Sequence, residues 1–203
     1  MLYPDACIVL FARAPVSGQV KTRLIPALGA GGACALHEQL LGKVLMILNQ
    51  KVLCARELWV DQLPEHPAFA SFAGPVHLQQ GADLGARLSH ALQQVHLRHR
   101  HVVFIGTDCP GLDIPYLEQA LKALQSGREL VLGPATDGGY VLIGCADFYP
   151  ALFNGIAWGT SEVLLQTIQQ AEYMKLDYTL LPALSDIDRP EDLQLLQQVN
   201  ALS

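Results

Sequence analysis

Charged residues are scarce in this chain, and basic residues are the scarcer kind. Asp and Glu number 19 and Lys and Arg only 13 among 203 residues, which gives a formal net charge of -6, and charged residues make up 16% of the chain. Nucleic-acid binding needs a basic surface, so the composition predicts no nucleic-acid partner. Hydrophobic residues make up 51%, which excludes a disordered protein and predicts a packed core.

Long apolar runs are also missing. No stretch approaches the roughly 18 consecutive apolar residues of a membrane-spanning helix, and the run from Leu40 to Leu48 is interrupted by Lys43. The first apolar run, Ala6–Ala12, is followed at once by Arg13 and Pro15, which predicts a strand and not a signal peptide. We therefore expect a cytoplasmic protein with no membrane partner.

Cysteine is limited to five residues, an odd number at unrelated spacings with no Cys-x-x-Cys pair. This pattern predicts reduced, mostly buried thiols. Cys109 stands beside Asp108, where a small space-filling residue is the simpler interpretation. Three histidines (His96, His99 and His101) lie close together, but the sequence offers no Cys or second cluster with matching spacing for zinc. A solvated turn before Val102 is therefore the expectation there.

Several familiar phosphate and hydrolase motifs are absent. The segment Gly18–Thr22 has Lys-Thr without the glycines of a P-loop. The glycine-rich segment Gly29–Cys34 fails the dinucleotide fingerprint at its last position, and we expect it only to start a helix at Gly32. The chain has no Gly-x-Ser-x-Gly elbow, so a hydrolase triad has no sequence support.

Short apolar runs alternate with segments of helical period, which predicts a mostly parallel sheet with helices on both faces. We expect a single domain over residues 1–203, with a local antiparallel departure near Asp137-Gly138-Gly139. The expected strands are Ala6–Ala12, Leu53–Val60, Val76–Gln79, Val102–Gly106, Leu130–Gly133, Tyr140–Gly144 and Thr179–Leu181. The expected helices are Gly32–Asn49, Leu84–Leu97, Ile114–Gln125, Ser161–Ala171 and Pro190–Val199.

Charge, Gly and Pro follow three of these strands. The loop Arg13–Arg23 holds three cations, and Thr107–Pro110 and Pro134–Tyr140 follow two later strands. Ligands bind at the carboxyl ends of such strands, so we expect the loops to converge. Lys and Arg bind phosphate oxygens, and Asp108 is suited to Mg²⁺ or Mn²⁺. A second carboxylate is available in Ser185–Asp192.

Within that last segment, Asp188 has two interpretations of equal weight. It is a candidate metal ligand. It also stands three residues before Glu191 and ahead of an apolar helix, which is the pattern of a capping box.

Six motifs together resemble the DUF2064 family, whose members are also described as glycosyltransferase-like transferases associated with radical-SAM proteins and selenodomains, and linked in some genomes to arsenosugar biosynthesis. The motifs are Phe11–Leu24, Gly81–Arg87, Ile105–Pro110, Gly133–Tyr140, Trp158–Ser161 and Asp186–Leu193. The resemblance implies the nucleotide-diphospho-sugar transferase superfamily and its GT-A-type fold, a three-layer α/β/α sandwich. It also implies similarity to molybdenum-cofactor guanylyltransferases and to 2-phospho-lactate guanylyltransferase.

The resemblance assigns functional roles to the residues at matching positions. It implies a phosphate-binding loop over Ala14–Arg23, a metal held by Asp108 and Asp188, a base or ribose side, and an acceptor side. The residues of the phosphate loop are Ala14, Pro15, Gly18, Lys21 and Arg23, and those of the base or ribose side are Asp83 and Arg87. The acceptor side comprises Asp137, Gly138, Gly139 and Tyr140, and the catalytic set Lys21, Arg23, Asp108 and Asp137.

Plain structural roles compete with three of these. Asp83 is also placed to cap the helix starting at Leu84, Arg87 to form a surface ion pair, and Asp137 to make a turn before Gly-Gly. Two departures from the family pattern concern Arg189, where Thr is usual, and Gly159, where Ser is usual. Arg189 is placed to pair with Asp186 or Asp188 and weaken a metal role there.

The resemblance implies a transferase that depends on Mg²⁺ or Mn²⁺ and uses an activated nucleotide with a small-molecule acceptor. A glycosyltransferase with a nucleotide-sugar donor is the first expectation. A nucleotidyltransferase that takes a nucleoside triphosphate and releases pyrophosphate is the second, and a non-catalytic nucleotide-binding protein the third. The apolar helices suit a core or a dimer interface equally well, so the oligomeric state stays open.

Overall fold

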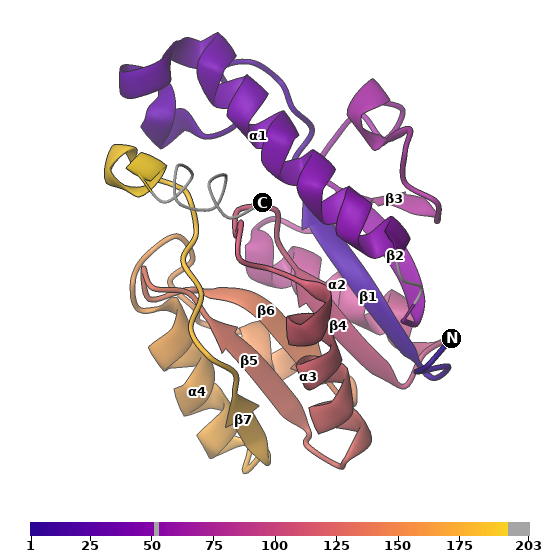
Figure 1. Cartoon of the computed structure of the whole chain (residues 1–203). Coiled ribbons are helices and arrows are strands. Elements are labelled where there is room, and N and C mark those ends of the chain that lie inside the picture. Colours follow the sequence, from indigo (N-terminus) through magenta and orange to yellow (C-terminus); the bar gives the residue numbers. More distant parts are fainter. Residues whose placement is uncertain (51–52, 195–203) are drawn as a thin grey trace.

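A single seven-stranded sheet organises the chain in the computed structural model, which describes residues 1–50 and 53–194 (Figure 1). The strands lie in the order β3-β2-β1-β4-β6-β5-β7. Every expected strand forms, with bounds that differ from the prediction by two residues at most. The strands are β1 (Ala6–Ala12), β2 (Ala55–Val60), β3 (Val76–Leu78), β4 (His101–Ile105), β5 (Leu130–Pro134), β6 (Tyr140–Cys145) and β7 (Tyr178–Leu180).

One strand runs against the others. β6 is antiparallel to both β4 and β5, whereas the remaining neighbours pair in parallel. The antiparallel departure expected near Asp137-Gly138-Gly139 is thus confirmed. As a result, the beginning of β6 lies at the edge of the sheet where β1 to β5 end. We call this the carboxyl edge.

Helices cover both faces of the sheet, which confirms the three-layer α/β/α sandwich. Apolar residues of α1 and α3 pack in one core cluster, and those of α2 and α4 in another. Figure 1 shows α1 and α3 in front of the sheet and α2 behind it. The helices are α1 (Ile25–Gln50), α2 (Leu84–His96), α3 (Ile114–Gln125) and α4 (Val163–Tyr173).

Three helix predictions need correction. α1 begins at Ile25, not Gly32, because helical turns form on both sides of Gly29, whose φ of 70° and ψ of 165° kink the helix. α4 begins at Val163, two residues after Ser161. The last expected helix starts as a 3-10 turn over Pro190–Asp192, and its part from residue 195 onward lies outside the described residues.

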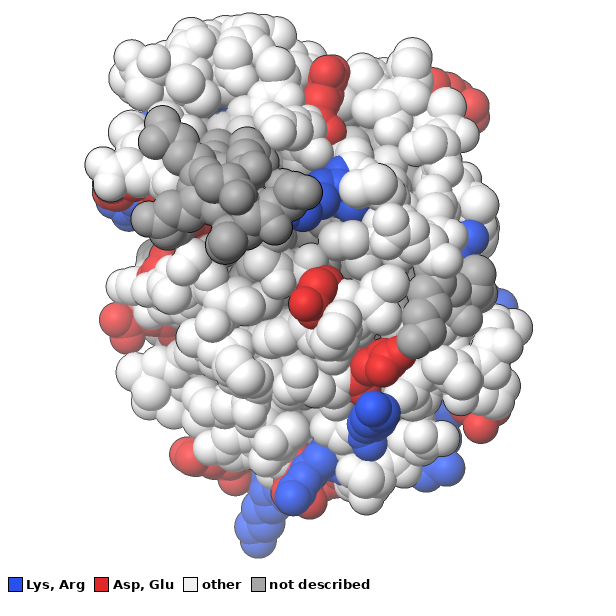
Figure 2. Space-filling view, in the orientation of Figure 1, with Lys and Arg blue, Asp and Glu red and all other residues white. Residues whose placement is uncertain are grey.

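The burial of the cysteines and the scattered surface charges agree with the composition. All five cysteines are buried and free of disulfide bonds, as predicted. Among the described residues, no helix combines the length and the apolar character needed to cross a membrane. On the face in Figure 2, charged side chains lie scattered among uncharged ones without a continuous basic patch.

Candidate functional site

Two adjoining pockets lie at the carboxyl edge, where the three loops singled out in the sequence meet. The larger has a volume of about 520 Å³ and the smaller about 160 Å³. Gly106, Tyr140 and Val141 line both pockets, so the two spaces are neighbours. The antiparallel direction of β6 makes this possible, because it brings Val141 beside Gly106, the residue that follows β4, whose backbone nitrogen donates to the carbonyl of Val141 at 3.3 Å.

The larger pocket is apolar on one side and polar on the other. Aromatic and aliphatic side chains from β1, α2, β4 and β6 form the apolar side, namely Phe11, Leu88, Phe104 and Ile143. The polar side is formed by Arg13, Gln19, Asp61, Gln62, Gln79 and Arg87. A planar, partly polar ligand suits such a lining.

Hydrogen bonds fix the polar side of this pocket. The amide nitrogen of Gln79 donates to the carbonyls of Ala12 (3.2 Å) and Trp59 (2.9 Å). Asp61 accepts from the backbone nitrogen of Ala14 (2.8 Å), and its other oxygen lies 3.3 Å from the Nε of Arg13. These contacts hold the start of the β1 loop against the ends of the neighbouring strands.

Asp61, Gln62 and Gln79 were missed in the sequence. Asp61 and Gln62 directly follow β2, and Gln79 directly follows β3. Their positions at strand ends were the available signal, because all parallel strands end at the same edge.

Lys21 joins three segments that are distant in sequence. Its side chain is only 2% exposed, and its Nζ lies 2.8 Å from Oδ1 of Asp108. The same ammonium donates to the carbonyl of Ile187. Lys21 itself takes a left-handed backbone conformation with φ of 49°. The loop therefore buries one of its predicted phosphate-binding cations against the predicted metal ligand.

Arg23 pairs with the other predicted metal ligand. Its Nη1 lies 2.5 Å from Oδ2 of Asp188, and its Nη2 donates to the carbonyl of Gly159 at 3.4 Å. Gly159 has a φ of +79°, which glycine adopts without strain. This conformation gives a physical reason for glycine where the resembling family usually has serine.

The turn at Pro190 is capped by Asp192. One carboxylate oxygen of Asp192 accepts from the backbone nitrogens of Asp188 (3.0 Å) and Arg189 (2.7 Å). The interpretation of Asp188 and Glu191 as a capping box is therefore wrong, because the side chain of Asp188 contacts Arg23 instead.

The smaller pocket gathers carboxylates from three loops. Asp108, Asp137 and Asp186 line it together with Cys109. Burial, and then the neighbouring carboxylates of Asp137 and Asp108, raise the pKa of Asp186 to about 6. A cation among these carboxylates would offset the repulsion that contributes to the raised pKa of Asp186. Among the described residues the lining includes Asp186 and not Asp188.

The turn before β6 has little freedom. Gly138 has a φ of +92°, and a Cβ on it would lie 2.2 Å from the carbonyl oxygen of Ser161. Asp137 Oδ1 accepts from the backbone nitrogen of Gly139 at 2.8 Å, so Asp137 makes the expected turn while also facing the pocket. The ring of Tyr140 packs edge-on against Trp158.

Three more sequence candidates find structural partners. Asp83 caps α2, because its Oδ1 accepts from the nitrogen of Ala86 at 2.8 Å. Arg87 lines the larger pocket and donates from Nε to the carbonyl of Gly81 at 3.2 Å. Cys109 is buried, and burial raises the pKa of its thiol to about 11, as expected of a space-filling residue.

The profile of the family described as "Uncharacterized protein conserved in bacteria (DUF2064)" matches residues 45–160. The chain belongs to the DUF2064 family. A comparison with curated proteins finds no match.

A solved structure agrees along nearly the whole chain. It is a Desulfovibrio desulfuricans G20 protein, provisionally assigned as a nucleotide-diphospho-sugar transferase. The two are 33% identical with a TM-score of 0.88, over 97% of this chain and 88% of that one. The DUF2064 chain therefore has the nucleotide-diphospho-sugar transferase fold.

Two more distant structures share only the fold. One is CMP:2-keto-3-deoxy-manno-octonic acid synthetase complexed with CTP, at 11% identity and a TM-score of 0.64, over 98% of this chain and 99% of that one. The other is a cytidylyltransferase from Leptospira borgpetersenii serovar Hardjo-bovis (strain JB197). It is 15% identical with a TM-score of 0.64, over 98% of this chain and 88% of that one.

Proposed function

We propose that this DUF2064 protein is a metal-dependent transferase whose donor is a nucleotide sugar. The observation that carries the proposal is the contact between a 520 Å³ pocket with one apolar side and a 160 Å³ pocket lined by carboxylates. A nucleoside fits the first, and a cation-bound diphosphate fits the boundary between them. The likeness to the Desulfovibrio desulfuricans protein supports a nucleotide-sugar donor.

The larger pocket would take the base and ribose. Phe11 and Phe104 supply flat apolar surface there, and Gln62, Gln79 and Arg87 supply polar atoms at the rim. The Gln79 amide nitrogen is held by two backbone carbonyls. Its oxygen is thus the group left to accept a hydrogen bond from a base.

The smaller pocket fits a hard divalent cation. Its carboxylates offer only oxygen, the donor that Mg²⁺ and Mn²⁺ prefer. We propose Asp108 and Asp186 as ligands, with Asp137 beside them, since these three carboxylates line the pocket, whereas its described lining does not include Asp188. When bound, the ion would neutralise charge on the phosphates of the leaving group.

Lys21 links the nucleotide to the metal. In the structure its ammonium neutralises Asp108. A phosphate is a competing partner for the ammonium, so a bound nucleotide would draw Lys21 from Asp108 and leave that carboxylate to the cation. Binding of nucleotide and of metal would then reinforce each other. Catalysis of this kind relies on positioned charge and needs no strong protein nucleophile.

Nucleotidyl transfer is the second candidate, favoured by the cytidylyltransferases that share the fold. The same cations would then act at the α-phosphate of a nucleoside triphosphate, and pyrophosphate would leave. The two reactions differ in their products. Sugar transfer liberates a nucleoside diphosphate, whereas nucleotidyl transfer liberates pyrophosphate.

A thermal-shift panel of nucleotide sugars and nucleoside triphosphates, with and without Mn²⁺, tests the proposal. A ligand at a hundred times its dissociation constant stabilises the fold by about 2.7 kcal/mol, which is readily measured. We expect the largest shift from a nucleotide sugar with Mn²⁺. If no nucleotide raises the melting temperature, both transferase candidates are wrong.

Product analysis of the ligands that bind then separates the candidates. Release of nucleoside diphosphate from a nucleotide sugar supports sugar transfer, and release of pyrophosphate from a triphosphate supports nucleotidyl transfer. Binding without either product, across a panel of acceptors, supports a nucleotide-binding protein without turnover.

A further inference from the structure

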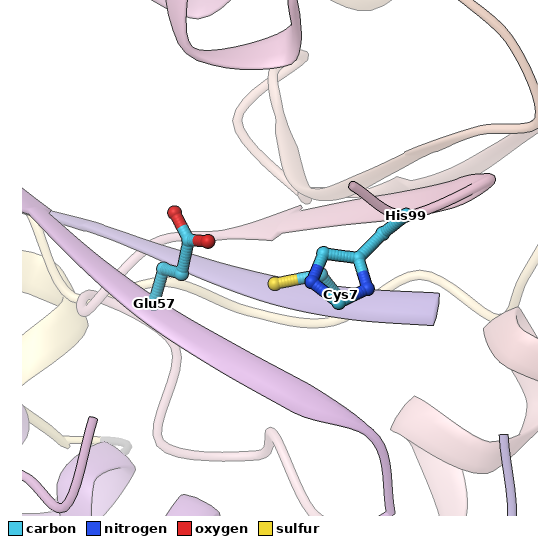
Figure 3. Close-up of side chains that lie close together, drawn as sticks. All are labelled: Cys7, Glu57 and His99. Atoms are coloured by element: carbon cyan, nitrogen blue, oxygen red, sulfur yellow. The ribbon is translucent and has the colours of Figure 1, made fainter. Parts of the chain in front are cut away.

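A second group of possible metal ligands lies away from the carboxyl edge. Cys7 stands at the beginning of β1, Glu57 in the middle of β2, and His99 in the turn between α2 and β4. One ligand atom from each side chain lies within 4.8 Å of the other two. Figure 3 shows the Cys7 sulfur and the His99 ring together, facing the Glu57 carboxylate.

The sheet brings Cys7 and Glu57 together. β1 and β2 are parallel neighbours in which Val9 pairs with Glu57. Cys7 is two residues before Val9, and alternate residues of a strand share a face. Both side chains are therefore on the same face, the one that α2 covers, and both residues are buried.

The Glu57 carboxylate is already oriented by neighbours. Its Oε1 lies 2.7 Å from Nη2 of Arg98, and its Oε2 accepts from Nε1 of Trp59 at 3.0 Å. His77 Nε2 is 3.3 Å from Oε2. A carboxylate offers about four lone-pair positions, so these three contacts leave room for a metal bond.

Such neighbours are the usual surroundings of a metal-bound carboxylate, which is itself hydrogen-bonded by an outer shell. Arg98 brings a positive charge, but its side chain is 47% exposed, so water screens much of that charge. The arrangement around Glu57 is thus compatible with a cation on the side of Cys7 and His99.

The other two ligands are available. Within residues 1–50 and 53–194, the His99 ring makes no hydrogen bond or ion pair. The Cys7 sulfur has one weak contact, with the carbonyl of Ile8 at 3.7 Å. Burial, and then the charge of Glu57, raise the pKa of the Cys7 thiol, so metal binding there would release the thiol proton to solvent.

We propose that Cys7, Glu57 and His99 bind a zinc-type divalent ion. Sulfur, nitrogen and oxygen in one site favour Zn²⁺ over Mg²⁺ or Mn²⁺, and three protein ligands leave a fourth position for water. The ion would tie the turn after α2 to β1 and β2 and so stabilise the fold. This site is independent of the proposed transferase reaction.

Co²⁺ titration of the full chain, after treatment with a chelator and in excess Mg²⁺, tests the site. Co²⁺ replaces Zn²⁺ in tetrahedral sites, and a cobalt–thiolate bond gives a charge-transfer absorption that carboxylate sites lack. We expect this band to appear and saturate, and Zn²⁺ to abolish it and raise the melting temperature.

Two variants and one matched control assign the band. Cys7→Ser should abolish it. His99→Ala, at a partly exposed position that tolerates truncation, should weaken Co²⁺ binding by more than about tenfold. The control Cys109→Ser removes the buried thiol beside Asp108 and should leave the band unchanged.

Circular dichroism without metal checks that each variant folds. If Cys7→Ser does not fold, the Co²⁺ affinity of His99→Ala serves as the test of the site. The proposal is overturned by a wild-type protein that shows no charge-transfer band at millimolar Co²⁺. The proposal is also overturned if His99→Ala keeps the band with unchanged Co²⁺ affinity, or if Cys109→Ser loses the band.

Discussion

The carboxyl edge and the Cys7–Glu57–His99 cluster both contain acidic side chains, but they surround those acids differently. Asp186 lies among other carboxylates, and burial and then these neighbours raise its pKa to about 6. Glu57 lies among an arginine, an indole N–H, an imidazole and a thiol. The carboxylates of the first site offer oxygen to a cation, whereas the second site offers oxygen, nitrogen and sulfur.

Ligand chemistry, and not acidity alone, therefore separates the two regions. A group of carboxylates suits Mg²⁺ or Mn²⁺ together with phosphate, and a mixed donor set suits Zn²⁺. The carboxyl edge also keeps its cations paired with its carboxylates, so a ligand there has ion pairs to exchange. The following variants test this difference.

Asp108→Asn has the largest expected effect. Loss of the carboxylate that anchors the metal should lower turnover by roughly a thousandfold, since a catalytic metal supplies several kcal/mol. The Mn²⁺-dependent part of the nucleotide thermal shift should disappear as well. Asp147→Asn is the matched control, since Asp147 is an exposed carboxylate after β6 that pairs with His96. If Asp108→Asn keeps its turnover, Asp108 is not the residue that holds the metal.

Glycine substitutions compare turns at opposite edges of the sheet. Gly138→Ala should destabilise the fold by about 3 kcal/mol, through left-handed strain and a clash with the carbonyl of Ser161. Gly127, before β5, also has a positive φ but meets nothing within 4 Å. Gly127→Ala should therefore cost only about 1 kcal/mol. Equal values from urea unfolding would argue against the close approach at Gly138.

Lys21→Met should change the affinity for nucleotide and the affinity for Mn²⁺ in opposite directions. Nucleotide binding should weaken by roughly 10- to 100-fold, because a charge-assisted hydrogen bond to phosphate is lost. Mn²⁺ binding without nucleotide should strengthen, because Asp108 loses its competing ammonium. Isothermal titration measures both. Lys122→Met, on α3, is the control for loss of one positive charge. Weaker Mn²⁺ binding in Lys21→Met would contradict the exchange of partners.

The smallest expected effect is the difference in Mn²⁺ affinity between Asp186→Asn and Asp188→Asn. The first should weaken Mn²⁺ binding by about tenfold, as expected for loss of a metal-associated carboxylate. The second should leave Mn²⁺ affinity unchanged and lower stability by less than about 1 kcal/mol, because it removes a partly exposed ion pair with Arg23. The reverse ranking in a Mn²⁺ titration would return the metal role to Asp188.

Local signals in the sequence were sufficient for most of the fold. Strands such as Ala6–Ala12 were found because apolar runs bounded by charge and proline are short-range patterns. Pro115 in the first turn marked α3, which forms over the predicted Ile114–Gln125. The start of α1 was misplaced because the glycines after Leu28 suggested a boundary, whereas packing of Leu24 and Leu36 in one cluster keeps turns on both sides of Gly29.

The candidate site was predicted only at its strand ends. The loops after β1, β4 and β5 were found because charge and glycine follow apolar runs. Asp61 was missed because a polar residue after a strand carries no motif, and Gln79 because it was placed at the end of the expected strand Val76–Gln79. The resemblance placed the second metal role at Asp188, whereas Asp186 lines the smaller pocket; the sequence could not separate the two because both stand in one short motif.

The order of residues along the chain was enough to predict the alternation of strands and helices, the shared edge at which the loops meet and the family resemblance. These depend on residues close together in the chain. The tertiary structure decided the partners: Lys21 contacts Ile187, 166 residues away, and Cys7, Glu57 and His99 meet from three separate segments. A local sequence pattern does not show which distant side chains meet, because the folding of the sheet and its loops determines which segments lie close together in space.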